Sequence, residues 1–205
     1  MLAAIPAWYS PWGHLLGTTS IGVITLIVAL PRLHAPTAWD YATVPLAFLF
    51  SNLVEWFVHR YFMHQRRWPF TVLYDRHTPQ HHRVYRYENM AIREPREFRL
   101  VLIPAAGVLL IVLTAVPVSM LAGLAANPNV GWLFLVTSAL YVVGYELSHL
   151  AYHLPESSLV YRVPFLRALR EHHARHHVPR LMHKANFNVT VPLGDFLFRT
   201  RAPRD

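Results

Sequence analysis

The sequence predicts an all-α integral membrane protein with about four transmembrane helices and a helical cap on the cytoplasmic side of the bilayer. Of its 205 residues, 54% are hydrophobic and only 15% are charged, which is too apolar a composition for an ordinary soluble domain. Several uncharged stretches reach the roughly 20 residues that a helix needs to cross the hydrocarbon core. The formal net charge is +8, and nearly all basic residues lie in two segments of the chain.

Four apolar runs account for the predicted spans. The first ends at Pro31, and the second carries ionisable residues, Glu55, His59 and Arg60, only toward its C-terminal end. No residue from Leu100 to Tyr145 has a formal charge, and this length accommodates two helices that fold back at an Asn-Pro-Asn turn signal near residue 128. The predicted spans are therefore residues 15–30, 41–61, 100–122 and 130–152.

The distribution of positive charge predicts the orientation of these spans, because Lys and Arg in short loops favour the cytoplasmic side. With four spans, the segments after the second and the fourth lie on the same side of the membrane. Together with the end of the second span, they hold every basic residue except Arg32. We therefore expect a multi-pass protein with both termini on the cytoplasmic side.

The same two segments are expected to form the cap. Residues 65–99 are too charged to span, and their alternating aromatic and arginine residues suit short interfacial helices. Residues 165–177 have helical spacing. Because no internal repeat divides the chain, we expect a single membrane-embedded domain over residues 1–205.

Histidine is the unusual residue of this chain. Cysteine is absent, so any bound metal must be held by nitrogen and oxygen atoms. Of the 14 histidines, His14, His34 and His183 are isolated and are expected at the membrane interface. The others form four clusters that the predicted topology delivers to one membrane face: HRYFMH at 59–64, HTPQHH at 77–82, HLAYH at 149–153 and HHARHH at 172–177.

Spacing within the clusters indicates which imidazoles share a helix face. His59 and His64 are five residues apart, about 140° around an α-helix, so they would clasp a site from two sides or after local unwinding. Histidines three or four residues apart lie on one face. This rule groups His77 with His81, His149 with His153, and His173 with His176 and His177.

These imidazoles predict a dimetal site. Imidazole suits zinc, copper, iron and nickel, and ten or more convergent histidines exceed the ligands that one ion takes. Glu55 and Glu146 precede His59 and His149 by about one helical turn. We expect these carboxylates to accept hydrogen bonds from metal-bound imidazoles, since intramembrane carboxylates are usually partnered. The alternative is an ion pair with Arg60 or another arginine.

Five sequence elements resemble the fatty acid hydroxylase and sterol desaturase superfamily of membrane di-iron proteins. EWFVHRYFMH, HTPQHH and GYELSHLAYH are similar to its first three histidine boxes, in order along the chain. LREHHARHH followed by NFNVTVPLGDFLFRT resembles the last box and tail of the fatty acid 2-hydroxylases. The resemblance covers residues 51–203, the expected catalytic region. Two departures are Gly194, where a Trp is common, and a second box with one residue more than the 2-hydroxylases usually have.

The resemblance implies a membrane-bound oxygenase that holds two iron ions and hydroxylates a lipid, most directly a fatty acyl chain, with O2 as co-substrate. Zinc could occupy the purified protein, since histidine sites bind it readily. No heme-binding motif occurs, so electrons are expected from a separate cytochrome b5- or ferredoxin-type donor with its reductase. The membrane is the other expected partner, and no nucleic acid is expected.

The resemblance also implies which residues form the site. Asn186 and Asp195 match tail positions near the site, where a supporting role is expected, and His172 is an alternative to His173. The implied ligands are His59, His64, His77, His81, His82, His149, His153, His173, His176 and His177.

Two other functions stay open from the residues. A sterol- or carotenoid-type oxidase or desaturase would use the same metal chemistry on another lipid. A divalent-metal transporter or storage protein would bind metal without oxidising a substrate. Transport favours polar residues through the middle of the spans, whereas residues 100–122 contain none beyond Thr114 and Ser119.

Overall fold

The structure, a computed structural model, describes residues 5–203 of the chain. The predicted cytoplasmic location of the two termini concerns ends that lie outside these residues. Within residues 5–203 the secondary structure is helical and contains no strand, only an isolated bridge between Arg86 and Asn89. The all-α prediction is therefore confirmed.

Four helices in the described part of the chain are long and apolar enough to cross a membrane, as the sequence predicts. A Thr37–Asp40 capping box starts the short α2 (Ala38–Tyr41), which leads directly into the second of them. The candidate spans are Pro11–Arg32, Ala38–Met63, Pro95–Ala125 and Pro128–Tyr152. Their main helices are α1 (Pro11–Ala29), α3 (Thr43–Val58), α7 (Ala105–Ala125) and α8 (Pro128–Tyr152).

The predicted third span, 100–122, lies within the candidate span Pro95–Ala125, but the helix is interrupted just after Leu100. A short helix, α6 (Phe98–Val101), ends there, and the chain is non-helical until α7 begins at Ala105. Pro104 explains the break, because proline has no amide proton and excludes the preceding residue from helical geometry. By contrast, Pro117 lies within the continuous helix α7.

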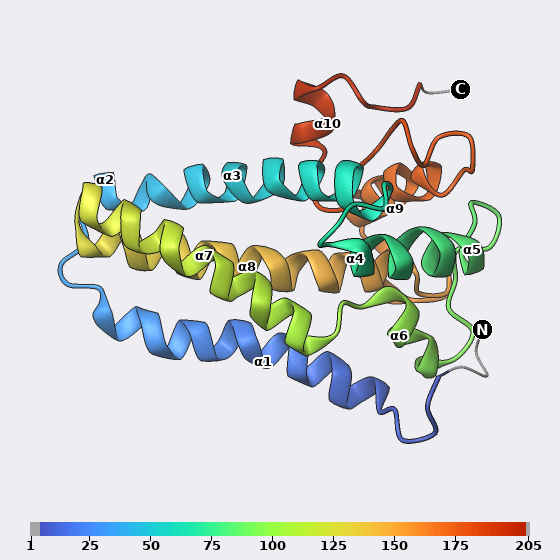
Figure 1. The fold of residues 1–205 in the computed structure, drawn as a ribbon, viewed down its shortest axis with the longest axis horizontal. Helices are drawn as coiled ribbons and strands as arrows, with labels where there is room; N and C mark the ends of the chain where they lie inside the picture. The colour runs from blue at the N-terminus through green and yellow to red at the C-terminus, as the bar shows by residue number, and fades with distance from the viewer. Residues whose placement is uncertain (1–4, 204–205) are drawn as a thin grey trace. The chain divides into compact units, whose positions relative to one another are not determined.

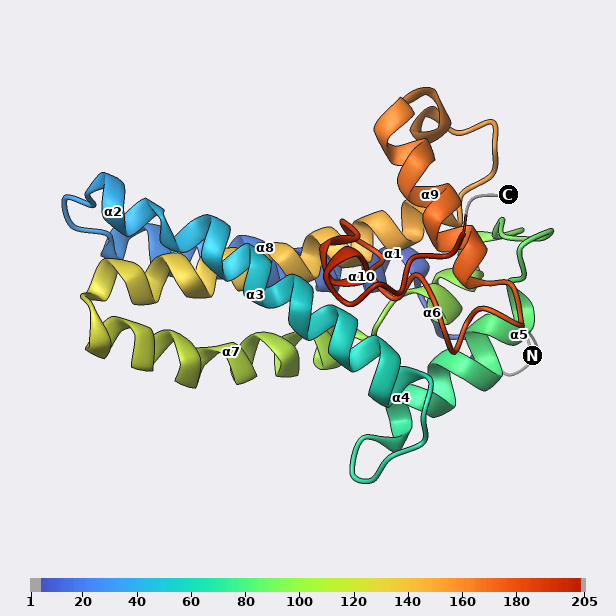
Figure 2. The same cartoon turned by 90° about the horizontal axis from the view of Figure 1, so that it is seen from above.

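Contacts divide the chain into two compact units, and α3 and α8 contribute residues to both. The helical unit comprises residues 12–51 and 103–146. Its helices approach closely: a Cβ on Gly22 of α1 would lie 2.9 Å from Val143 of α8. Figure 2 shows α7 and α8 joined by a short turn, and there Asn127 donates a hydrogen bond to Asp40 at 2.7 Å.

The histidine unit comprises the described residues up to 11, residues 52–102 and residues 147–203. Figure 1 shows its short helices grouped around the C-terminal ends of α3 and α8. The predicted short helices within residues 65–99 and the predicted helix at 165–177 are confirmed. Besides α6, these are α4 (Thr71–Arg76), α5 (His82–Val84) and α9 (Pro164–His176). The short helix α10 (Leu193–Leu197) was not predicted.

Candidate metal centre

Ten buried histidines of the histidine unit converge in two groups of five. In each group, one ring nitrogen from every histidine lies within 4.8 Å of those from the other four. The first group is His59, His64, His77, His82 and His176, and the second is His81, His149, His153, His173 and His177. These are the ten histidines that the resemblance implies as ligands, and the structure brings all of them together.

The first group is assembled by two π-helical turns. Helix α3 continues as a π-helix over His59–Met63, and α4 continues as a π-helix over His77–His81. A π-helix bonds residues five apart, so it brings residues at that spacing toward one face. His59 and His64 thus place their Nε2 atoms 3.2 Å apart, and His77 and His82 place theirs 3.0 Å apart. The predicted local unwinding at the end of the second span takes this form.

The π-helical turn also changes the expected grouping of His77 and His81. Their rings remain stacked, with centroids 5.2 Å apart, but their ligand atoms belong to different groups. At the end of α9, His173 and the capping residue His177 share the second group at α-helical spacing, whereas His176 lies in the first. The spacing rule had placed His173, His176 and His177 on one face, as it had placed His77 and His81, and the structure corrects both expectations. Each of these two segments contributes histidines to both groups.

Spacing correctly paired His149 with His153. Both lie at the C-terminal end of α8 and belong to the second group. His172 is in neither group within the described residues, and its Nε2 lies 3.1 Å from a carboxylate oxygen of Asp195. The geometry therefore favours His173 over His172 as the candidate ligand.

Backbone carbonyls fix the orientation of several rings in these groups. A carbonyl oxygen only accepts hydrogen bonds, so the ring nitrogen facing it must carry the proton. Nδ1 of His59 donates to Phe187 O, and Nδ1 of His176 donates to Ala185 O at 2.8 Å. In the second group, the Nδ1 atoms of His81, His153 and His177 donate to Leu100 O, Met90 O and Tyr85 O at 2.9, 2.7 and 2.8 Å.

This tautomer leaves lone pairs that face one another. A neutral imidazole has one N–H, so donation through Nδ1 leaves an acceptor at Nε2. The Nε2 atoms of His81 and His177 are 3.3 Å apart. Burial, followed by the charge of a neighbouring histidine, holds the pKa of both rings well below the usual 6.5, so neither retains a second proton. Facing lone pairs repel unless a cation lies between them, and neutral imidazoles are good ligands for divalent transition metals. The donor set thus fits metal ions.

Tyr85 is a site residue that the sequence did not single out. Its ring lies against His153, with centroids 4.6 Å apart, and its carbonyl orients His177. Its hydroxyl donates to the buried Glu97 at 2.8 Å. Burial, the hydrogen bond and the negative charge of Glu97 raise the pKa of Tyr85 above 10. Glu97 also accepts a hydrogen bond from the side chain of Arg93 at 2.9 Å.

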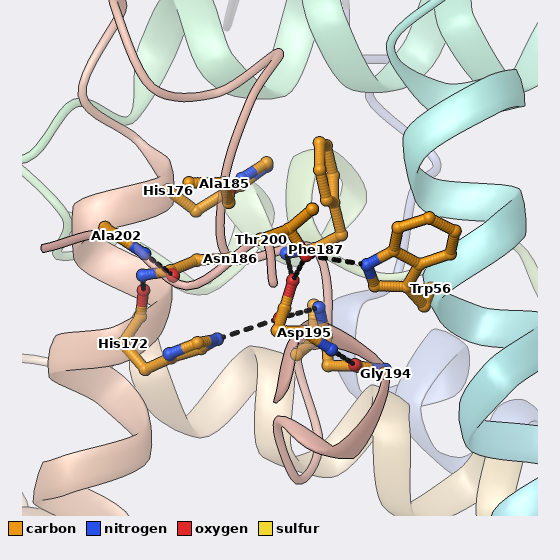
Figure 3. Close-up of polar contacts among 12 residues, drawn as sticks. Trp56, His172, His176, Ala185, Asn186, Phe187, Gly194, Asp195, Thr200 and Ala202 are labelled. Carbon is orange, nitrogen blue, oxygen red and sulfur yellow. Dashed lines mark hydrogen bonds and ion pairs between the residues drawn. The ribbon is translucent and has the colours of Figure 1, made fainter. Parts of the chain in front are cut away.

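Asp195 organises the tail that supplies two of the orienting carbonyls (Figure 3). Its carboxylate accepts hydrogen bonds from the backbone amides of Phe187 and Asn188 at 2.9 and 2.8 Å. It also accepts one from the hydroxyl of Thr200 at 2.6 Å. The same hydroxyl receives the indole N–H of Trp56 at 2.9 Å, which ties the tail to α3.

Asn186 fixes the neighbouring turn of this tail. Its backbone has a φ of 58°, a left-handed conformation that asparagine tolerates better than most residues. Its side chain donates to the carbonyl of His172 at 2.8 Å and accepts from the amide of Ala202 at 2.7 Å. Asn186 and Asp195 therefore fix the backbone of the tail beside the first group.

The two intramembrane glutamates have backbone partners. Glu55 accepts hydrogen bonds from the amide of Val189 and from both the amide and the hydroxyl of Thr190, the last two at 3.2 and 2.6 Å. Glu146 accepts from the amide of Ile103 at 2.7 Å, next to the break before α7. Both glutamates thus receive backbone hydrogen bonds from non-helical segments.

Sequence reasoning had no means of finding the orienting carbonyls. Every residue carries a carbonyl, so nothing in the identities of Leu100, Met90 or Ala185 marks them as partners of histidine. Gly194 did carry a signal as a departure from the family pattern. A Cβ there would lie 2.7 Å from Asn188 Oδ1 and 2.8 Å from Trp56 Cβ, so this tail has no room for a larger residue.

Comparisons with known proteins agree with this architecture. The chain is similar to a solved structure described as full-length Scs7p, of which only the hydroxylase domain is visible. The two share 19% identity with a TM-score of 0.64, over 95% of this chain and 67% of that one, which shows a common fold. The comparison with curated proteins finds no match. The family model for fatty acid hydroxylase matches residues 44–200, well over half of the sequence, and the chain therefore belongs to the fatty acid hydroxylase family.

Proposed function

We propose that this protein is a membrane-bound di-iron oxygenase that hydroxylates a lipid, with a fatty acyl chain as the leading substrate. Membership of the fatty acid hydroxylase family supports a lipid hydroxylase. The observation that carries the finer proposal is the pair of histidine groups, because two sets of five inward-facing imidazoles suit two metal ions. The ten histidines of the first and second groups would be the ligands.

Iron fits the proposed chemistry better than a redox-inert ion. Side chains alone do not oxidise an unactivated C–H bond, and bound iron would supply the electron-transfer and dioxygen chemistry that this step needs. One oxygen atom of O2 enters the C–H bond, and the other leaves as water with two electrons and two protons. A separate cytochrome b5- or ferredoxin-type donor with its reductase would supply the electrons.

The chain itself would contribute orientation and exclusion of water. The carbonyls of Phe187 and Ala185 keep His59 and His176 in the tautomer that directs Nε2 inward. The ten candidate ligands are buried, which excludes bulk water from the site. Asn186 and Asp195 would support the first group through the tail, whereas Glu55 and Glu146 would fix the segments at 189–190 and 103.

We also infer that the site and both termini face the cytoplasm. The four apolar helices indicate a membrane protein, and basic residues after the second and fourth spans outnumber those of the other loops. Because the chain has no cysteine, single cysteines can report sidedness. A cysteine at Arg180 should resist an impermeant maleimide in intact cells and react after permeabilisation. Reaction in intact cells would show the opposite orientation.

Metal content tests the proposed site directly. Protein purified anaerobically with ferrous iron should contain about two iron ions per chain. His153→Gln should reduce this content, whereas His34→Gln should not, since the backbone of His34 makes its hydrogen bonds to Asn129. Iron content that is equal in the two variants would contradict the proposed ligand set.

Lipid analysis tests the reaction. Cells that express the protein with a donor system should accumulate lipids 16 mass units heavier than their precursors, with the added oxygen derived from 18O2. Loss of two mass units would indicate desaturation, and oxidation of fed sterols or carotenoids alone would replace the acyl substrate. An unchanged lipid profile together with metal flux in proteoliposomes would indicate a transporter instead.

A further inference from the structure

We propose that the C-terminal segment 188–198, including α10, re-enters the bilayer beside α3 and presents its exposed apolar side chains to lipid acyl chains. Both views of the fold place α10 beside the C-terminal part of α3 (Figures 1 and 2). The whole contact lies within the histidine unit, since that unit begins at Asn52 of α3. The inference does not depend on the proposed oxygenase activity.

The contact lies at membrane depth on α3. Residues 38–63 form a candidate span, and Asn52 is one residue from the midpoint of the 41–61 stretch that the sequence predicts to cross the bilayer. At about 1.5 Å per residue, Glu55 is about 6 Å from this midpoint, well inside a hydrocarbon half-thickness of about 15 Å. A segment that binds Asn52 directly therefore lies within the hydrocarbon layer.

Asn52 holds the segment through both ends of its side-chain amide. Its oxygen accepts a hydrogen bond from the amide of Gly194 at 3.0 Å, and its nitrogen donates to Val191 O at 2.7 Å. Its own carbonyl accepts from the side chain of Asn188 at 3.0 Å. A fully buried asparagine in the middle of an apolar span thus acts as the attachment point of the tail.

Other side chains accept hydrogen bonds from further backbone amides of the segment. Glu55 receives the amides of Val189 and Thr190, and Asp195 receives the amide of Asn188. The side chain of Asn188 in turn receives the amide of Asp195 at 3.0 Å. Non-helical backbone is tolerated at membrane depth only where protein groups satisfy its hydrogen bonds. The amides of residues 188–190, 194 and 195 meet that requirement through side-chain acceptors, which a water-exposed loop would not need.

The outer face of the segment is apolar. Leu193, Phe196, Leu197 and Phe198 are exposed, by 70% for Phe196 and 60% for Leu197. A cluster of this kind on a protein surface indicates a binding partner or a membrane. Because the segment is attached to α3, a candidate membrane span, we infer that lipid acyl chains contact this cluster. Arg199 follows the cluster directly and is exposed, so its guanidinium can extend toward the headgroups.

The segment would connect the lipid phase to the first histidine group. The tail that leads into it carries the carbonyls of Ala185 and Phe187, which orient His176 and His59. Phe198 stacks on Trp56 of α3, with ring centroids 4.2 Å apart. Displacement of the apolar cluster would therefore act on ligands of the metal site through a short stretch of backbone.

Spin labelling tests the depth of α10 on a cysteine-free background. Nitroxides on Phe196→Cys and Leu197→Cys in nanodiscs should be more accessible to O2, which concentrates in hydrocarbon, than to a water-soluble nickel chelate. Lipids labelled at known acyl positions calibrate the depth, and Arg180→Cys is the matched water-exposed position. Labels on α10 that behave like the label at Arg180 would overturn the proposal.

A measurement on the unsubstituted protein covers the case in which a labelled variant misfolds. Lipids with a photoactivatable group in the acyl chain should crosslink to residues 193–198, as they should to the exposed face of α7, for example at Leu113. Mass spectrometry of the digested protein would locate the adducts. Adducts on α7 with none on residues 193–198 would refute re-entry.

Discussion

Replacement of Asp195 by asparagine should weaken both the fold and the first histidine group. One carboxylate oxygen accepts from the amide of Phe187 and the hydroxyl of Thr200, and the other accepts from the amide of Asn188. Asparagine has an oxygen at only one of these positions. Its NH2 group must therefore face a backbone N–H, either that of Phe187 or that of Asn188, and one buried donor loses its acceptor.

The size of the effect follows from these contacts. A buried donor left without an acceptor costs about 1–3 kcal/mol, and bonds to a charged acceptor contribute about 1.5–3 kcal/mol. Allowing for partial relaxation, we expect Asp195→Asn to lower the free energy of unfolding by about 2–4 kcal/mol. For a domain of this size, that corresponds to a fall of roughly 4–16 °C in Tm. Because Phe187 orients His59, we also expect about a 10–100-fold loss of metal affinity.

Thermal unfolding in nanodiscs and a chelator titration would measure the two effects separately. Asp75→Asn is the matched control, because Asp75 forms an exposed ion pair with Arg66, and such pairs contribute about 0–1 kcal/mol. Metal analysis should show that Asp195→Asn loses metal while Asp75→Asn retains it. If Asp195→Asn matches the control in both Tm and metal content, the tail does not support the site and the reasoning fails.

Three further outcomes follow from the structure. Gly194→Ala should destabilise the protein by about 1–3 kcal/mol, because its Cβ would overlap Asn188 and Trp56; an unchanged Tm would contradict this close packing. Tyr85→Phe should cost about 1–3 kcal/mol by removing a donor to the buried Glu97, as chemical denaturation in detergent would measure; a stability equal to that of the parent would show that Glu97 is satisfied without it. Removal of metal by a strong chelator should lower the Tm, by the equivalent of about 4 kcal/mol for an ion held at 1,000 times its Kd. A Tm that chelation leaves unaltered would argue against ions in the histidine groups.

Much of the fold could be predicted from the sequence because the bilayer imposes simple rules. Helices that cross it must be about 20 residues long and nearly free of charge, and the four candidate spans meet this rule. The rule is less informative about where a helix is interrupted. Pro104 breaks the third span whereas Pro117 does not, since the local partners of the backbone decide how a proline is accommodated.

The histidine site likewise could be predicted from the sequence only in part. Clustering predicted that the histidines converge, the family resemblance implied the ten that do, and α-helical spacing correctly paired His149 with His153. Spacing did not assign His77, His81 and His82 to their groups, because a π-helical turn replaced the expected α-helical geometry there. Glu55 was expected to accept a hydrogen bond from a metal-bound imidazole, and no property of its sequence position indicated the hydrogen bonds that it accepts from Val189 and Thr190.

The sequence by itself determined the apolar helices, their approximate ends and the abundance of imidazole, because hydropathy and residue type are properties of local composition. Only the tertiary structure decided which histidines form each group and which carbonyls orient them. It also decided that Asn52 and Glu55 hold the C-terminal tail against α3. These features join residues up to about 140 positions apart, such as Asn52 and Gly194. Hydrogen-bond geometry between such distant segments depends on how the whole chain packs, and no local pattern of residues encodes it.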